Sequence, residues 1–392
     1  MYFLRKEDFI MNLGSGPKLV RHKNEWKKGE EKNKKSLYAA LDLGTNSCRM
    51  LIARPTGPRF EIVDAFSKSV RLGLDLERTG ELSQAGITRA LQALHVCSKK
   101  LKKFEVRRSR LVATEACRRS KNGKKFLGKV KRDTGLTLEL IKPEEEARLA
   151  VISCAPLLDP KYSQALIVDI GGGSTELVWI DLAEVPEQLR IAAMLELKLG
   201  QYEKSEGPTL PNKQKKVKIV DWISVPLGVA TLLEKYSDVE NDSARFALMS
   251  CDFEQQIENF LPYFSEEIIN RKKDLQIIGT SGTVTTLGAV HLGLRRYDRL
   301  KVDGLKLGAA DIDAVVKKFL ELGPEGRKKE PGIGRDRAEL IMSGSAIMQT
   351  LLRIWPAKSM RVADRGLREG ILYSLMSADN HFGKGNEKSI AQ

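Results

Sequence analysis

Two similar stretches of sequence decide the fold of this chain. The first is Leu41-Asp-Leu-Gly-Thr-Asn-Ser-Cys-Arg-Met-Leu-Ile52, and the second, 127 residues further on, is Val168-Asp-Ile-Gly-Gly-Gly-Ser-Thr-Glu-Leu-Val-Trp179. Each pattern predicts a strand that ends in Asp-x-Gly, a polar turn that contains a serine, and a second strand. A repeat on the scale of a domain indicates two similarly folded halves that face one another across a cleft.

In the segments around the first stretch, the spacing of apolar residues alternates between a pattern typical of strands and one typical of helices. Apolar runs bounded by Pro and Gly predict strands, whereas apolar residues three and four apart predict helices. Ser83 is placed to cap the first helix, and Pro143 suits the first position of a later one. We expect strands over 37–44, 49–53, 60–66, 111–113 and 138–141, and helices over 83–103, around 123–134 and from 143 onward.

The same alternation restarts at Ala165. Strand groups that alternate with helices indicate an α/β fold. We expect strands over 165–170, 175–180, near 192–197 and over 275–279, helices near 243–272, 310–322 and 336–354, and a polar loop over 201–217.

Composition narrows the class of protein. The 392 residues are 42% hydrophobic and 30% charged, and no apolar run approaches the ~18 residues that span a bilayer. The five cysteines are scattered and the four histidines show no metal-binding spacing, so neither a disulfide framework nor a zinc site is expected. We therefore expect a cytoplasmic protein without membrane contact.

The formal net charge of +15 predicts attraction to polyanions. Residues 1–35 contribute ten basic and five acidic side chains, which is typical of a solvated, disordered extension. Few aromatic residues and no recognisable RNA-binding motif argue against a specific nucleic-acid partner.

Both repeated turns combine glycine with hydroxyl side chains at the end of a strand. Backbone N–H groups in such a turn can close around phosphate oxygens, and the carboxylates of Asp42 and Asp169 are placed to hold hydrated Mg²⁺ or Mn²⁺. One such turn alone is more often a hairpin with a satisfied Asx side chain, but the duplication favours phosphate binding. The candidate phosphate-binding residues of the turns are Gly44, Thr45, Asn46, Ser47, Gly171, Gly172, Gly173, Ser174 and Thr175.

These two turns resemble the first and second phosphate motifs of the superfamily that joins actin, the heat-shock chaperone ATPases and sugar kinases. More narrowly, roughly residues 37 to 377 resemble the exopolyphosphatase and guanosine pentaphosphate phosphohydrolase (Ppx/GppA) family, with eight motifs in the family's order. The further motifs are Ala113-Thr-Glu-Ala-Cys-Arg118, Glu144-Glu-Glu-Ala-Arg-Leu149, Ser224-Val-Pro-Leu-Gly228, Ile278-Gly-Thr-Ser-Gly-Thr283, Arg337-Ala-Glu-Leu-Ile341 and Gly366-Leu-Arg-Glu-Gly-Ile371.

The resemblance implies two ribonuclease H-like, actin-like ATPase domains around a central cleft. With about 16 residues after Met376, the chain resembles the family's short two-domain form. The expected organisation is a disordered basic extension over 1–36, domain I over 37–163, domain II over 164–363, a helix at about 364–377 that packs back on domain I, and a flexible tail over 378–392.

The resemblance also implies which carboxylates act on the substrate. The family's water-activating carboxylate is the first glutamate of Glu-Glu-Ala-Arg-Leu, which corresponds to Glu145. Glu176, just after the second turn, matches the family acid that positions water or metal, so Asp42, Asp169 and Glu176 are the expected metal-binding group. As a solvent-facing strand residue, Glu176 could also be idle.

The sequence around Glu145 allows a second interpretation. Pro143 would place residues 144–146 in the first turn of a helix, where carboxylates interact favourably with the helix dipole and Glu144 can pair with Arg148. The acids would then only stabilise the helix. Where the family has Ser-Gly or a similar pair before the acids, this chain has Lys142-Pro143.

Basic residues complete the expected site. Arg49 and Arg118 match family arginines near the phosphate chain, where a guanidinium suits two phosphate oxygens. Arg119, Lys121 and Arg148 either extend this lining or are simply solvated. The turn at 279–283, which leads from a strand into a helix, is either a nucleotide or polyphosphate site or only a capped turn. Its candidate residues, together with a family position that contacts guanosine polyphosphates, are Gly279, Ser281, Gly282, Thr283 and Arg337.

The sequence thus predicts a hydrolase that removes terminal phosphate from inorganic polyphosphate, from guanosine pentaphosphate (pppGpp) of the stringent response, or from both. Mg²⁺ would offset the charge, and a carboxylate would activate the attacking water. Two alternatives stay open: a kinase or ATPase of the same superfamily, and a non-catalytic polyanion- or RNA-binding protein. A homodimer is compatible with the sequence, which does not fix the oligomeric state.

Overall fold

The computed structural model describes residues 36–57, 59–197, 217–265, 274–334, 337–379 and 381. The extension expected over 1–36 lies outside these residues apart from Ser36, as does the expected loop over 201–217 apart from Val217. Most of the expected tail over 378–392 is likewise outside them. Within the described part of the chain, no helix combines the length and apolarity needed to cross a membrane.

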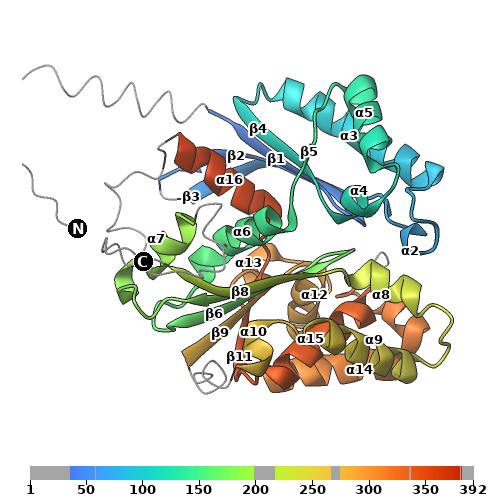
Figure 1. Cartoon of the computed structure of the whole chain (residues 1–392), viewed down its shortest axis with the longest axis vertical. Helices are drawn as coiled ribbons and strands as arrows, with labels where there is room; N and C mark the ends of the chain where they lie inside the picture. Colours follow the sequence, from blue (N-terminus) through green and yellow to red (C-terminus); the bar gives the residue numbers. More distant parts are fainter. Residues whose placement is uncertain are drawn as a thin grey trace, which may run out of the picture.

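The first sheet and its helices form what we call lobe I (Figure 1). The strand order is β3-β2-β1-β4-β5, with antiparallel β1–β2 and β2–β3 pairs and parallel β1–β4 and β4–β5 pairs. The strands are β1 (Tyr38–Leu43), β2 (Ser47–Thr56), β3 (Arg59–Ser69), β4 (Arg108–Ala113) and β5 (Glu139–Leu140). The helices are α2 (Leu76–Thr79), α3 (Gln84–Lys103), α4 (Glu115–Arg119) and α5 (Gly123–Thr134).

The second sheet forms lobe II and repeats this order as β8-β7-β6-β9-β11, with β10 added at the edge. Because both lobes share one strand order, the predicted pair of similar α/β, ribonuclease H-like domains is confirmed. The strands are β6 (Gln164–Ile170), β7 (Thr175–Asp181), β8 (Lys218–Val225), β9 (Leu275–Thr280), β10 (Lys306–Gly308) and β11 (Ser359–Ala363). The helices are η2 (Glu187–Leu189), α7 (Arg190–Leu195), α8 (Val229–Lys235), α9 (Asp242–Gln256), α10 (Leu261–Phe264), α12 (Gly282–His291), α13 (Arg299–Val302), α14 (Ala309–Lys329) and α15 (Ile341–Ile354).

Two helices, α6 (Pro143–Cys154) and α16 (Leu367–Ala378), lie between the sheets (Figure 1), and η1 (Ala155–Leu157) follows α6. In α6, Leu149 packs on the inner face of the lobe I sheet, whereas Val151 packs on the inner face of the lobe II sheet. In α16, Ile371 and Tyr373 divide in the same way. Because α3 and α5 cover the outer face of one sheet, and α9, α12, α14 and α15 that of the other, both sheets are buried on two faces.

The two connecting helices cross in close contact. A Cβ atom on Gly370 of α16 would overlap the backbone oxygen of Leu149 in α6, so the crossing requires a glycine. Helix α16 also packs against β1. The lobes are therefore joined by tightly packed helices, while the domain boundaries at 163 and 363 stay a prediction.

Several predicted starts of helices are confirmed in detail. The Ser83 hydroxyl accepts a hydrogen bond from the Gly86 N–H (3.2 Å) at the start of α3, and Pro143 is the first residue of α6. The prediction near 192–197 was wrong, because this segment lies mostly in α7. Its Ala, Met and Leu residues favour a helix and lack the β-branched side chains that favour a strand.

Two long predicted helices have different limits. The helix expected near 243–272 ends at Gln256, and Pro262 lies in the first turn of the separate helix α10. The helix expected over 310–322 continues to Lys329, but Gly323, with φ of +62°, breaks its regular backbone immediately before Pro324.

Candidate active site

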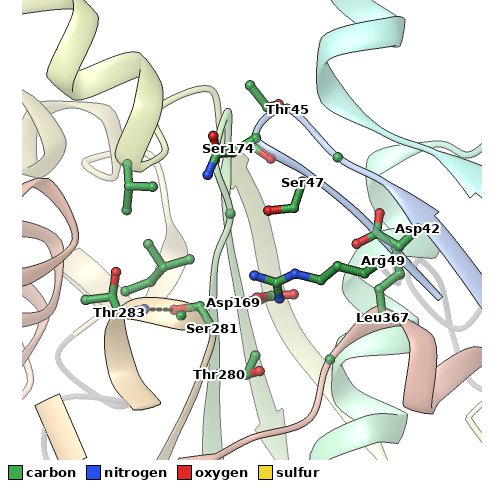
Figure 2. Close-up of a pocket in the computed structure, with 18 of the residues that line it drawn as sticks. Asp42, Thr45, Ser47, Arg49, Asp169, Ser174, Thr280, Ser281, Thr283 and Leu367 are labelled. Carbon is green, nitrogen blue, oxygen red and sulfur yellow. Dashed lines mark hydrogen bonds between the residues drawn. The ribbon is translucent and has the colours of Figure 1, made fainter. Parts of the chain in front are cut away.

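A cavity of 190 Å³ lies between the lobes, and both repeated turns line it. Figure 2 shows Asp42, Ser47 and Arg49 of lobe I facing Asp169, Ser281 and Thr283 of lobe II. Sixteen of the residues predicted from the sequence line this cleft: Asp42, Gly44, Thr45, Asn46, Ser47, Arg49, Asp169, Gly171, Gly172, Gly173, Ser174, Glu176, Ser281, Gly282, Thr283 and Arg337.

The two turns have the same construction and touch one another. The Gly44 N–H donates to the Ser47 carbonyl (3.0 Å), and the Gly171 N–H donates to the Ser174 carbonyl (2.9 Å). A Cβ atom on Gly172 would lie 3.2 Å from Thr45, closer than ordinary contact. The glycines therefore let the turns meet at the top of the cleft.

The carbonyl groups of each turn accept hydrogen bonds from N–H groups of the same lobe, on the side away from the cleft. In lobe I, the Asn46 carbonyl accepts hydrogen bonds from the N–H groups of Val70 (2.8 Å) and Arg71 (3.0 Å). In lobe II, the N–H groups of Val229 and Ala230 at the start of α8 donate to the carbonyls of Gly171 (3.0 Å) and Gly172 (2.8 Å). These bonds fix the orientation of the turn peptides.

The opposite side of these peptides is available to a ligand. Within the described residues, no protein acceptor receives a hydrogen bond from the N–H groups of Thr45, Asn46, Gly172 or Gly173. Unpaired N–H groups in two facing turns form a concave site that suits anionic oxygens.

Three carboxylates lie below the turns: Glu176 is buried, and Asp42 and Asp169 are partly buried. Burial and the charge of Asp42 raise the pKa of Asp169 to about 7. Burial and the charge of Asp169 raise the pKa of Glu176 to about 7, although hydrogen bonds from Ser174 (2.7 Å) and Ser224 (2.9 Å) to Glu176 Oε1 oppose the shift. Burial also raises the pKa of Asp42. This group would be stabilised by a bound cation.

The donor set suits a magnesium ion that is shared with the substrate. No hydrogen bond or ion pair within the described residues engages the carboxylate of Asp42 or Asp169. The same part of the chain contains no group of three or more His, Cys, Asp or Glu side chains that could hold an ion alone. Mg²⁺ commonly uses one or two carboxylates and completes its shell with water and phosphate oxygens.

Glu145 does not line the cleft, which corrects its expected placement. Its carboxylate accepts hydrogen bonds from Arg110 (2.5 Å) and Arg148 (2.7 and 2.9 Å), so Arg148 pairs with Glu145 rather than with Glu144. Burial alone would raise the pKa of Glu145, but these arginines outweigh it and lower the pKa. A carboxylate held in this way is a poor proton acceptor.

The neighbouring Glu146 faces the cleft instead. Burial and the charge of Glu176 raise its pKa well above the usual range, with further contributions from Asp42 and Asp169. Arg118 donates to its Oε2 (3.3 Å) and also to the Ile141 carbonyl (2.9 Å). Glu146 therefore combines access to the cleft, a raised pKa and a fixed orientation, and only its membership of the acidic motif pointed to it in the sequence.

The two arginines predicted to bind phosphate have different surroundings. Arg49 reaches from β2 into the cleft below the turns (Figure 2), and no acid of the described residues pairs with it. Burial and the charge of Arg368 lower the pKa of Arg49. Arg118 does not line the cleft, because it is paired with Glu115 and Glu146.

Two further predicted residues, Thr175 and Gly279, support the cleft from outside its lining. The Thr175 hydroxyl donates to the Leu227 carbonyl (2.8 Å), and Gly279 packs against Met360 and Val284. The start of α12 does reach the cleft, where the Ser281 hydroxyl accepts a hydrogen bond from the Thr283 N–H (3.2 Å).

Arg337 lies over the first turn of α12. Its guanidinium donates to the Gly282 carbonyl (3.3 Å) and the Thr286 hydroxyl (2.9 Å). Sequence reasoning did not select several other lining residues, although most of them lie in quoted motifs: Thr114, Glu115, Glu146, Thr280, Asp364, Arg365, Gly366, Leu367 and Arg368.

Comparison with known proteins matches the chain to a family. The model of the Ppx/GppA phosphatase family matches residues 51–200 and 209–379. The crystal structure of the Ppx/GppA family member from Aquifex aeolicus is 31% identical, aligns over 88% of this chain and 99% of its own, and gives a TM-score of 0.64. An exopolyphosphatase-like protein is 25% identical over 87% and 99% of the two chains, with a TM-score of 0.71.

An exopolyphosphatase from Cytophaga hutchinsonii shares the fold, with a TM-score of 0.71 at 20% identity over 88% and 98% of the two chains. The match of the family model covers most of both lobes and the phosphate turn of lobe II, while its start at residue 51 leaves out the turn of lobe I. The chain, with its two actin-like domains, therefore belongs to the Ppx/GppA phosphatase family of hydrolases.

Proposed function

We propose that this protein is a Mg²⁺-dependent exopolyphosphatase, which hydrolyses the terminal phosphoanhydride bond of inorganic polyphosphate and accepts pppGpp in the same cleft. One observation carries the proposal. The two glycine turns meet across a single cleft, with their carbonyls fixed from behind and their N–H groups unpaired within the described residues. Such a site fits a chain of phosphoryl groups better than a compact uncharged ligand.

Substrate binding then follows from the chain's own donors. The N–H groups of both turns and the guanidinium of Arg49 bind the non-bridging oxygens of the terminal phosphoryl groups. Helix α12 is ten residues long, and the N–H groups of its first turn, beside Ser281, provide further donors to the phosphate oxygens. Mg²⁺ at Asp42 and Asp169 would neutralise phosphate charge and so favour departure of the leaving group.

Glu146 takes the role that the sequence suggested for Glu145. Its carboxylate orients a water molecule and accepts a proton from it, which the raised pKa of Glu146 favours. The water oxygen attacks the terminal phosphorus in line, and the bond from that phosphorus to the bridging oxygen breaks. Orthophosphate and a polyphosphate chain shorter by one unit are the products. Arg118 holds Glu146 in place throughout.

The distribution of charge supports a polyanionic substrate. Residues 37–163 contain 25 Lys and Arg against 14 Asp and Glu, whereas residues 164–363 contain 27 and 28. The basic excess of the folded part thus lies in lobe I. A field of this sign attracts a long polyanion and raises its rate of association at low salt.

The experiment offers long-chain polyphosphate, pppGpp and ATP separately to the purified full chain with Mg²⁺ and follows orthophosphate. The proposal expects release from polyphosphate without added ATP, and release from pppGpp in the same assay. Release from ATP alone would instead identify an ATPase or kinase of the same superfamily. Binding of RNA without any release would identify a polyanion-binding protein.

A further inference from the structure

One arginine of the cleft was not selected by the sequence. Arg368 is the second residue of α16 and follows Leu367, which Figure 2 labels. It lines the cavity, and 17% of its side-chain surface is exposed. The preceding segment, residues 364–366, also lines the cavity, so α16 begins directly at the cleft.

The position is an unfavourable one for a positive charge. A cation in the first turn of a helix opposes the helix dipole. Within the described residues, the nearest acid is Glu369, at 4.0 Å, but its carboxylate already accepts hydrogen bonds from Arg299 (3.1 Å) and from the Gly366 N–H (3.0 Å). Arg368 is therefore only weakly compensated by the protein.

Arg49 lines the same cavity and makes no ion pair with an acid of the described residues. Asp42, Arg49 and Arg368 line one cavity, and the charge of Arg368 lowers the pKa of both Arg49 and Asp42. The two guanidinium charges repel one another, and the charge of Asp42 offsets this repulsion at Arg49 only in part. A bound anion would relieve the repulsion.

Three other arginines at or near the cleft have acidic partners. Arg365, three residues earlier, makes a bidentate pair with Asp303 (2.9 to 3.2 Å), and Arg110 is shared by Glu139 and Glu145. Arg118 is likewise paired with acids.

Arg337 also lines the cleft without an acidic partner in the described residues, but it donates to the Gly282 carbonyl and the Thr286 hydroxyl. Of the cleft-lining arginines in the described residues, Arg49 and Arg368 are the two whose side chains donate no hydrogen bond to the protein.

We propose that Arg368 is a substrate-binding residue, which together with Arg49 binds the phosphoryl group next to Asp42. The inference rests on the proposed function and adds to it a residue from a helix that follows lobe II and packs on lobe I. The two guanidinium groups, on β2 and α16, approach the group from two elements and each can donate two hydrogen bonds to its oxygens.

The test compares Arg368→Ala and Arg368→Lys with Lys317→Ala, which removes one positive charge from an exposed part of α14 where the side chain is 79% exposed. The first readout is KM for polyphosphate. The second is the rise in Tm caused by tripolyphosphate, which is measured in variants that also carry Glu146→Gln so that tripolyphosphate is not hydrolysed during the measurement. Arg368→Ala is expected to raise KM roughly tenfold or more and to abolish the Tm rise. Lys317→Ala should change neither.

Two further results separate binding from folding. The ligand-free Tm of Arg368→Ala should equal or exceed that of the wild type, because a repulsive charge is removed, and added guanidinium should restore part of the activity. The KM and the Tm rise of Arg368→Lys should lie between those of the wild type and Arg368→Ala, since lysine keeps the charge but loses the planar guanidinium that binds two oxygens. A lower ligand-free Tm with unchanged KM, or an unchanged response to tripolyphosphate, would overturn the inference.

Failure of the proposed function looks different. In that case the wild type releases no orthophosphate from polyphosphate, and the tripolyphosphate measurement still decides whether Arg368 binds a phosphoryl group. If the wild type is active but Arg368→Ala matches it in KM and in the Tm response, only the role of Arg368 is removed.

Discussion

Arg49 lies directly opposite Asp42 in the β1–β2 ladder. The same position of the second hairpin, opposite Asp169 in the β6–β7 ladder, is taken by Glu176. The duplicated hairpins have therefore diverged at this one cross-strand position, with a cation in lobe I and an acid in lobe II. This difference lets one turn neutralise phosphate while the other contributes to a negatively charged site for a cation and water.

The contact between the two turns can be tested with alanine. In Gly173→Ala the new Cβ would overlap the Thr45 hydroxyl, and Glu115 lies 3.1 Å away, so the turns must separate. We expect the free energy of unfolding to fall by about 1–3 kcal/mol and kcat/KM to fall more steeply than stability explains. Denaturant unfolding and steady-state kinetics measure the two effects.

Gly128→Ala is the matched control. Gly128 lies inside α5, and its nearest neighbour to a Cβ is Arg132 at 3.9 Å, so alanine fits and should add about 1 kcal/mol of stability with normal activity. Equal activity in the two variants would contradict a role for the contact between the turns.

The carboxylate group predicts a response to metal. In Asp169→Asn one negative charge that interacts with Asp42 is removed, so the metal-free variant should have a higher Tm than the metal-free wild type at pH 8. Adding Mg²⁺ should raise the Tm of the wild type but not that of the variant. Asp238→Asn, at an exposed position, is the control. A Mg²⁺ response that survives in Asp169→Asn would remove Asp169 from the metal site.

Glu145 should matter for stability and not for chemistry. Its pairs with Arg110 and Arg148 are lost or weakened in Glu145→Gln, and we expect a decrease of about 1–3 kcal/mol in the free energy of unfolding. Turnover per folded molecule should stay within a few-fold of the wild type. Thermal unfolding followed by kinetics below the transition checks both, and a large loss of turnover without loss of stability would return the catalytic role to Glu145.

Deletion of residues 1–35 separates the hydrolase from the rival RNA-binding function. The extension carries ten basic side chains, so an RNA-binding protein should lose most of its affinity on deletion. The hydrolase should keep its turnover, because every residue of the proposed site lies beyond residue 36. Filter binding and orthophosphate release on the same preparation decide between them.

The repeat was sufficient to predict two similar lobes around a cleft, whereas the ribonuclease H-like fold was predicted from the family resemblance. Two copies of strand, turn and strand placed Asp42 and Asp169 at equivalent strand ends, and the structure brings both to one cleft. The reason is physical: a strand that runs into a glycine turn fixes the position of its last side chain through the ladder itself.

The sequence could not show which of the three consecutive glutamates, residues 144–146, faces the cleft. Pro143 fixes where α6 begins, but successive residues of a helix point about 100° apart, and a one-residue difference in alignment exchanges Glu145 for Glu146. Only the positions of Arg110 and Arg118 on neighbouring elements decide which acid is paired and which faces the cleft.

Arg368 was missed for a different reason. Its motif was recognised, but its approach to Asp42 joins residues more than 300 positions apart and depends on α16 packing between the sheets. No local pattern carries that information. Where a site depends on such a long-range contact, sequence motifs indicate the segment but not the residue.

The most direct measurement is orthophosphate release from polyphosphate by Glu146→Gln and the wild type, at saturating substrate with Mg²⁺. The account predicts that kcat falls by roughly 10²–10⁴-fold, with KM and the tripolyphosphate-induced Tm rise nearly unchanged, because Glu146 accepts the proton but does not anchor the chain. A variant that turns over at the wild-type rate would contradict the account.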